Sequence, residues 1–120
     1  MKKTILFFLG LTLCACHRNA DTLIGTWIAD KVNVQFDEKR STPELVKQIG
    51  EMEKQNVFTI TADSLLTFKG LDDSFQGRIN LESNGTLYCK GAVFGIWKDR
   101  QIVTRTNSPL GEIVVVYRKE

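Results

Sequence analysis

Short stretches in which apolar and polar residues alternate follow one another from Thr26 to the C-terminus. In residues 74–82, for example, Phe75, Ile79 and Leu81 occupy one set of alternate positions, and polar residues occupy most of the other set. Because successive side chains of a β-strand point to opposite faces of the sheet, this pattern predicts strands with one face toward a core and one toward water. The predicted strands are residues 26–36, 57–61, 64–69, 74–82, 86–91, 92–98, 101–107 and 111–118.

Turn-forming residues separate these strands. Asn84-Gly85 is the strongest turn, since both residues tolerate the positive φ that a tight hairpin requires. Within the first strand the apolar residues change parity between Ala29 and Val32. This change predicts a β-bulge near Asp30-Lys31, which would direct both sets of side chains to the same face.

The segment between the first two strands has a helical pattern instead. Ser41-Thr42-Pro43-Glu44 combines a hydroxyl cap, a proline in the first turn and an early carboxylate, which together predict a helix N-terminus. Leu45, Val46, Ile49 and Met52 then recur at helical spacing. Two roles are open for this helix: packing on the sheet or over one end of it, or acting as a mobile lid over a ligand cavity.

The N-terminus has the features of an export signal. Lys2 and Lys3 precede an apolar run over residues 4–13, which is far shorter than the ~20 residues that a membrane-spanning helix needs. The run ends in Leu13-Cys14-Ala15-Cys16, which resembles the lipobox of bacterial lipoproteins. The alternative is a secreted protein that is cut at another residue.

The lipobox resemblance implies the domain organisation and the location of the protein. Residues 1–15 would be a signal peptide, Cys16 would carry the lipid anchor after cleavage, and residues 16–22 would form a polar tether. Residues 23–120 would form one domain. Since His17 rather than aspartate follows Cys16, we expect anchoring in the outer membrane of the bacterial envelope, facing the periplasm.

Charge and cysteine content narrow the possible partners. The sequence has 16 basic and 14 acidic residues, and loss of Lys2 and Lys3 with the signal peptide would make the two numbers equal. No basic stripe is left that would indicate a nucleic acid partner. Cleavage and acylation would leave Cys89 as the one free thiol, and its alternation with Leu87 predicts that it is buried as a small apolar residue.

The residues available for catalysis are few. His17, the one histidine, lies next to the predicted anchor and not in the domain, so no Cys–His or Ser–His pair and no histidine-rich metal site is expected. Asp72-Asp73 fits a solvated turn better than a calcium site. Spacing singles out no pair of carboxylates, although it leaves a glycosidase-type pair open. We therefore expect a protein that is not an enzyme and has no metal or other cofactor.

A family resemblance rests on Gly25 and Trp27 at the start of the first strand, since Gly-x-Trp at this place resembles the opening motif of lipocalin-like (calycin-type) proteins. It implies a mainly β fold, an eight-stranded antiparallel up-and-down barrel, with one helix between strands 1 and 2, similar to small bacterial lipocalin-like lipoproteins. In this family an arginine near the end of the last strand packs over the tryptophan. The resemblance therefore implies that Arg118 lies over Trp27 and seals the base of the barrel.

The resemblance favours a binding protein that holds a small apolar or amphipathic ligand. The candidate lining residues are Phe58, Ile60, Phe68, Phe75, Phe94 and Ile96. The alternative is that these side chains fill the interior and leave no cavity, as small barrels commonly do.

A second hypothesis is a protein–protein module. The residues from Gly85 to Gly91, with Tyr88 and the later Trp97-Lys98, distantly resemble a motif of membrane-bound lysozyme inhibitors, although the spacing is longer here and the disulfide of that family is absent. A third hypothesis is a subunit of an envelope complex that binds its protein partner through Tyr88 and Val93.

Overall fold

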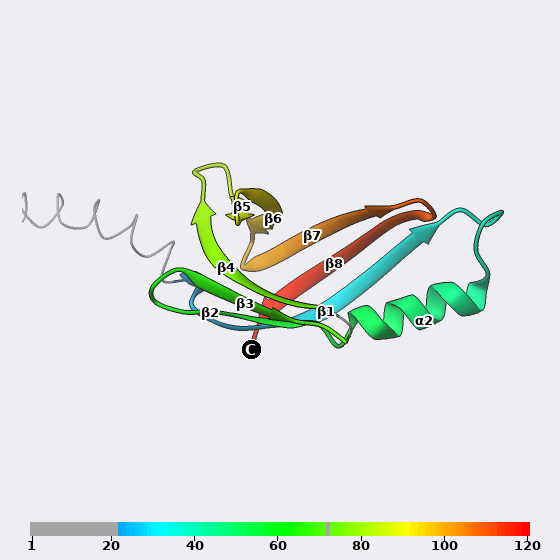
Figure 1. Cartoon of the computed structure of the whole chain (residues 1–120), viewed down its shortest axis with the longest axis horizontal. Coiled ribbons are helices and arrows are strands. Elements are labelled where there is room, and N and C mark those ends of the chain that lie inside the picture. Colours follow the sequence, from blue (N-terminus) through cyan, green and yellow to red (C-terminus); the bar gives the residue numbers. More distant parts are fainter. Residues whose placement is uncertain (1–21, 72) are drawn as a thin grey trace, which may run out of the picture.

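The computed structural model describes residues 22–71 and 73–120, in which eight antiparallel strands close into one barrel in chain order (Figure 1). The strands are β1 (Gly25–Phe36), β2 (Val57–Ile60), β3 (Leu65–Lys69), β4 (Ser74–Leu81), β5 (Thr86–Cys89), β6 (Ala92–Lys98), β7 (Gln101–Ser108) and β8 (Gly111–Lys119). The predicted fold class is confirmed, including the single helix between the first two strands. The predicted signal peptide, Cys16, His17 and most of the tether lie outside the described residues.

The predicted bulge in β1 is present. In the pairing of β1 with β8, the register shifts between Ala29 and Lys31. Trp27 on one side of the shift and Val32 and Val34 on the other therefore all belong to the core or pack against it. The bulge allows a single long strand to keep its apolar face inward along its whole length.

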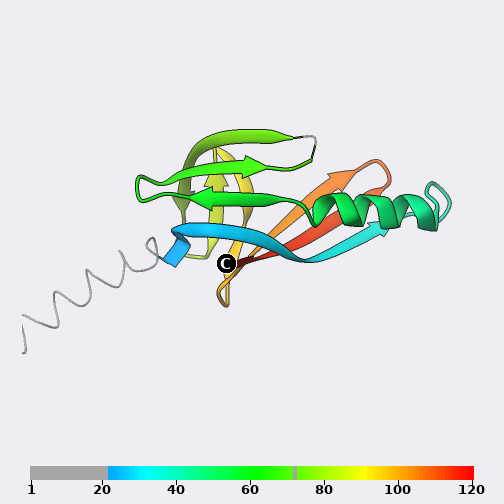
Figure 2. The ribbon, with the colours of Figure 1, turned by 90° about the horizontal axis from the view of Figure 1, so that it is seen from below.

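Three strands continue beyond the closed part of the barrel. β7 and β8 pair from Gln101 to Ser108, whereas β6 pairs with β7 only over residues 96–98. On the other side, β1 pairs with β2 only over residues 25–28, and with β8 from Trp27 to Phe36. β1, β8 and β7 thus form a three-stranded extension, along which the helix lies (Figure 2).

The helix α2 (Pro43–Glu53) begins as the sequence predicts. Thr42 is the N-cap, and its hydroxyl oxygen accepts a hydrogen bond of 3.2 Å from the Leu45 backbone N–H. Pro43 occupies the first turn, where its missing N–H has no cost. Ile49 packs against the core from the inner face of the helix. In residues 22–71 and 73–120 no helix has the length and apolar character needed to cross a membrane.

Gly50 leaves room for a stabilising substitution in α2. A Cβ at this position would lie 3.9 Å from a methyl group of Val34, which is ordinary van der Waals contact. Since alanine is favoured over glycine inside a helix, we expect Gly50→Ala to raise the free energy of unfolding by about 1 kcal/mol, measured by urea denaturation. Gly91→Ala is the control, because φ is +80° there and alanine should destabilise. A loss of stability in Gly50→Ala would contradict this account of α2 packing.

The core in the closed part of the barrel is built around stacked aromatic rings. Trp27 and Phe58 lie 5.9 Å apart between ring centroids and are nearly parallel, and Tyr117 meets Phe58 edge-on at 4.8 Å. The Trp27 indole N–H donates a buried hydrogen bond of 2.8 Å to the Leu23 carbonyl, so its one polar atom is satisfied. Cys89 is buried, as predicted, and burial raises the pKa of its thiol.

The arrangement of Arg118 differs from the one that the resemblance implied. Its side chain is half exposed, and Nε lies 3.3 Å from a carboxylate oxygen of Asp30 on the outer face. Trp27 is fully buried, and its register partner on β8 is Lys119. Because Tyr117 points into the core, strand alternation directs Arg118 outward, so it does not cover the Trp27 ring.

Candidate functional site

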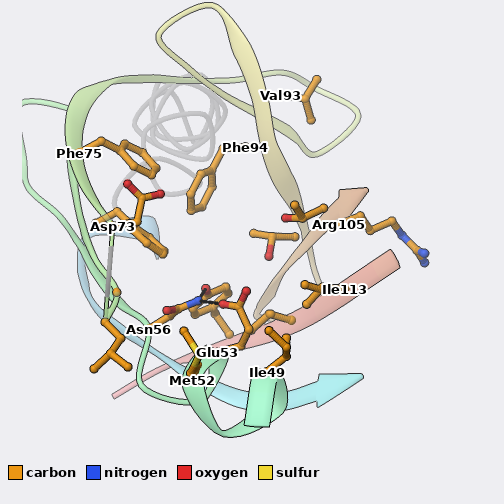
Figure 3. A pocket seen from close by; sticks show the side chains of 17 residues that line it. Ile49, Met52, Glu53, Asn56, Asp73, Phe75, Val93, Phe94, Arg105 and Ile113 are labelled. Carbon is orange, nitrogen blue, oxygen red and sulfur yellow. Dashed lines mark hydrogen bonds between the residues drawn. The ribbon is translucent and has the colours of Figure 1, made fainter. Parts of the chain in front are cut away.

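A cavity of about 430 Å³ lies at the end of the barrel next to α2 (Figure 3). Its walls come from α2, from β3, β4 and the residues between them, and from β6, β7 and β8. This volume falls in the lower part of the range typical of small-molecule sites. The barrel is therefore not completely filled by its own side chains.

Three phenylalanines form one wall of the cavity. Phe68 and Phe75 are register partners on β3 and β4, and their rings stack at 5.0 Å between centroids. Phe94 of β6 meets both rings edge-on, at 6.4 Å and 6.2 Å. The opposite wall is aliphatic and includes Met52 of α2 and Ile113 of β8. The cavity thus offers an apolar interior with flat aromatic faces.

A buried polar group lies at the base of the cavity. Asn56, which follows α2, donates through its side-chain amide to the Tyr117 hydroxyl oxygen at 3.2 Å and to a carboxylate oxygen of Glu53. Asn56 is only 8% exposed, so these bonds satisfy an amide that burial would otherwise destabilise. All three residues line the cavity. The hydrogen bonds between these three residues fix the orientation of the polar side-chain atoms that a ligand in the cavity would contact.

Tyr117 should remain protonated well above ordinary pH. Burial raises the pKa of its hydroxyl from 10.0 to about 12. Between these values the unfolded chain loses the proton and the folded chain keeps it, so the free energy of unfolding should fall as pH rises through this window, by about 2 kcal/mol at pH 12. Urea denaturation at several alkaline pH values measures this, with Tyr117→Phe as the control that lacks the tyrosine contribution. If the free energy of unfolding falls equally with pH in the unchanged protein and in Tyr117→Phe, this prediction is contradicted.

The predicted lining residues divide into three groups. Phe68, Phe75 and Phe94 line the cavity. Phe58 and Ile60 are buried in the core and do not line it, although Phe58 contacts Phe94 at 5.1 Å. The prediction for Ile96 is wrong, since this side chain is 45% exposed on the outside of the barrel.

A second bulge explains the error at Ile96. In the pairing of β5 with β6, Leu87 lies opposite Gly95 and Tyr88 lies opposite Val93, so Phe94 is an extra residue on β6. Both Phe94 and Gly95 are therefore on the inner side, and the alternation places Ile96 on the outer face. The register with β5 determines this change, and the apolar pattern of β6 alone does not reveal it.

Sequence reasoning missed the lining residues from α2 and from the last two strands. Met52 belongs to the apolar face of α2, which could have indicated that the helix covers a cavity. On β8, Ile113, Val115 and Tyr117 alternate at every second position, which marks them as inward-facing. The polar group of Asn56, Glu53 and Tyr117 had no sequence signal, because strand and helix are brought together only by the tertiary fold.

The residues on which the lysozyme-inhibitor and envelope-complex hypotheses rest also have defined positions in the structure. Leu87 and Cys89 are buried, Tyr88 is half-buried, and Lys90-Gly91 forms the turn between β5 and β6. Val93 is 62% exposed at the rim of the cavity. In the described part of the chain, no three His, Cys, Asp or Glu side chains come together as a group that could hold a metal ion.

Comparison of the chain with protein-family models, with curated proteins and with solved structures gave no significant match.

Proposed function

We propose that this chain is a lipid-anchored, lipocalin-like binding protein of the bacterial cell envelope that holds a small apolar or amphipathic ligand. The observation that carries the proposal is the cavity of about 430 Å³ with its phenylalanine wall. Large apolar surfaces are left open to a cavity at a cost in stability, which a ligand can recover by filling it. The polar group at the base supplies hydrogen-bonding partners for an amphipathic molecule.

The position of the cavity is consistent with anchoring at Cys16. β1 begins at Gly25, at the end of the barrel that is remote from α2 (Figure 1). The cavity lies next to α2. An anchor that precedes Gly25 would therefore be attached at the end of the barrel opposite the cavity. His17 after Cys16, in place of aspartate, supports attachment of this anchor to the outer membrane.

Binding can be tested by occluding the cavity. The protein is expressed from Met1 with Cys16→Ser, so that no lipid is attached, and titrated with an uncharged fluorescent dye whose emission rises in apolar surroundings. Thr106 lines the cavity from the exposed part of β7, and we expect Thr106→Trp to weaken binding by about tenfold or more. Asn107→Trp is the matched control, since Asn107 is exposed on the same strand and does not line the cavity. Absence of binding to the unoccluded protein, or equal binding by both tryptophan variants, would refute the proposal.

A protein–protein module is the second candidate, and exposed apolar side chains favour it. Leu71 and Val93 are 57% and 62% exposed, and both lie at the rim of the cavity. A lysozyme-type inhibitor would have to present such a rim, or the Lys90-Gly91 turn, to the enzyme. A lysis assay with a stoichiometric excess of this protein separates the candidates, because a carrier of small ligands should leave lysozyme activity unchanged.

A further inference from the structure

The cavity contains two carboxylates without a basic partner. Glu53 lines it from the end of α2, and Asp73 lines it from the residue before β4. The side-chain ion pairs found in residues 22–71 and 73–120 include neither of them. Figure 3 shows the Asp73 carboxylate between Phe75 and Phe94, directed into the cavity. Negative charge is thus brought next to aromatic rings, and neither carboxylate forms an ion pair within the described residues.

Arg105 is the one basic residue of the lining, and it does not neutralise these carboxylates. Its Nη1 lies 3.0 Å from a carboxylate oxygen of Glu112, which is outside the lining. In Figure 3 the guanidinium group extends away from the cavity. The positive charge of Arg105 is therefore directed outward and paired, and the ionised groups that face the interior are negative.

The aromatic wall adds to the attraction for a cation. The faces of Phe68, Phe75 and Phe94 carry the negative part of the ring quadrupole, which attracts an ammonium group within about 6 Å of a ring centroid. The chain itself provides an example, since Lys90 Nζ lies 5.9 Å from the Phe75 ring centroid. Lys90 is exposed and does not line the cavity.

We propose that the cavity selects an organic cation, namely an amine or a quaternary ammonium group that carries an apolar substituent. This inference rests on the proposed function and specifies the ligand class for the same cavity. The cationic head would lie between the carboxylates of Glu53 and Asp73 and the phenylalanine faces, and the substituent would contact Met52 and Ile113. An anionic amphiphile would place its head beside two like charges, so it should bind most weakly.

The test compares ligands that share one chain and differ in charge. The Cys16→Ser protein, expressed from Met1, is titrated calorimetrically with octyltrimethylammonium, octanol and octanoate at low ionic strength. We expect the cation to bind about tenfold more tightly than octanol, with octanoate weakest, and the advantage of the cation should shrink as salt is added. Equal affinity for the cation and octanol would overturn the charge inference and leave the proposed function intact. If none of the three binds, both proposals fail.

Variants locate the selectivity in the cavity. Glu53→Gln and Asp73→Asn should each reduce the preference for the cation and keep the affinity for octanol. Glu51→Gln on the same helix and Asp99→Asn, both at exposed residues outside the lining, are the matched controls and should change neither affinity. Phe75→Leu keeps an apolar side chain in the wall but removes the ring. It should weaken binding of the cation more than binding of octanol. A preference that survives in both carboxylate variants would overturn the inference, and circular dichroism verifies that each variant is folded.

Discussion

Replacement of Phe58 by alanine is expected to lower the free energy of unfolding by about 4 kcal/mol, a large part of the stability of a domain of this size. Phe58 is 1% exposed and touches three other rings, those of Trp27, Phe94 and Tyr117. Its removal leaves a space that these large side chains cannot close without moving the strands that carry them. Urea denaturation followed by circular dichroism measures the loss.

Phe36→Ala is the control for this prediction. Phe36 ends β1 in the three-stranded extension and is only half-buried, so the same truncation should cost clearly less there. If the two variants lose equal stability, the stability of the domain does not depend on the Phe58 cluster in the way described. Because Phe58 also supports Phe94, ligand binding by the Phe58→Ala variant should fall as well.

A second large effect is expected at Gly111, the first residue of β8. Its φ is +149°, and a Cβ there would lie 2.1 Å from the Gln35 carbonyl oxygen and 2.8 Å from Phe36 Cα, both of which are backbone atoms. Gly111→Ala therefore combines an unfavourable backbone conformation with a clash that no side-chain rotation can relieve. We expect a loss of about 3 kcal/mol or more in the free energy of unfolding.

The consequence of Gly111→Ala should be concentrated where β1 ends. Phe36 is the register partner of Gly111, so separation of the backbones would break the last pairs between β1 and β8. Hydrogen exchange should show faster exchange of the amides near Phe36, together with the lower overall stability. Gly91→Ala is the control for backbone conformation alone, because φ is +80° there but no atom lies within 4 Å of the added Cβ. A similar loss in both variants would show that the contact with Gln35 is unimportant.

The strands and the bulge in β1 could be predicted because their signals are local. Alternation at period two reflects burial of one face of a strand, and the change of parity between Ala29 and Val32 is visible within that strand. In β6 the alternation of Phe94 with Ile96 is regular, and only the pairing with β5 shows that one residue is extra. Register between strands is a property of two segments, so a single segment does not contain it.

Only the lining residues that lie on the strands of the barrel wall could be predicted from the sequence. Phe68 and Phe75 face inward by strand alternation, and the sequence identified them. The other wall required knowing that α2 lies beside the extension and that Met52 lines the cavity, which the helical pattern does not specify. The place given to Arg118 was wrong for a related reason: a family motif locates a charge near the seam of the barrel, but alternation from Tyr117 determines which face it occupies.

The barrel wall is continuous only at the end where β1 pairs with β2 and β6 pairs with β7. β7 beyond Val103 has no partner on β6, and β1 beyond Ile28 has none on β2 within the described residues. The edges of the three-stranded extension are therefore not paired with β2 or β6. A ligand that enters between these unpaired edges would reach the interior without the breaking of any hydrogen bond between strands.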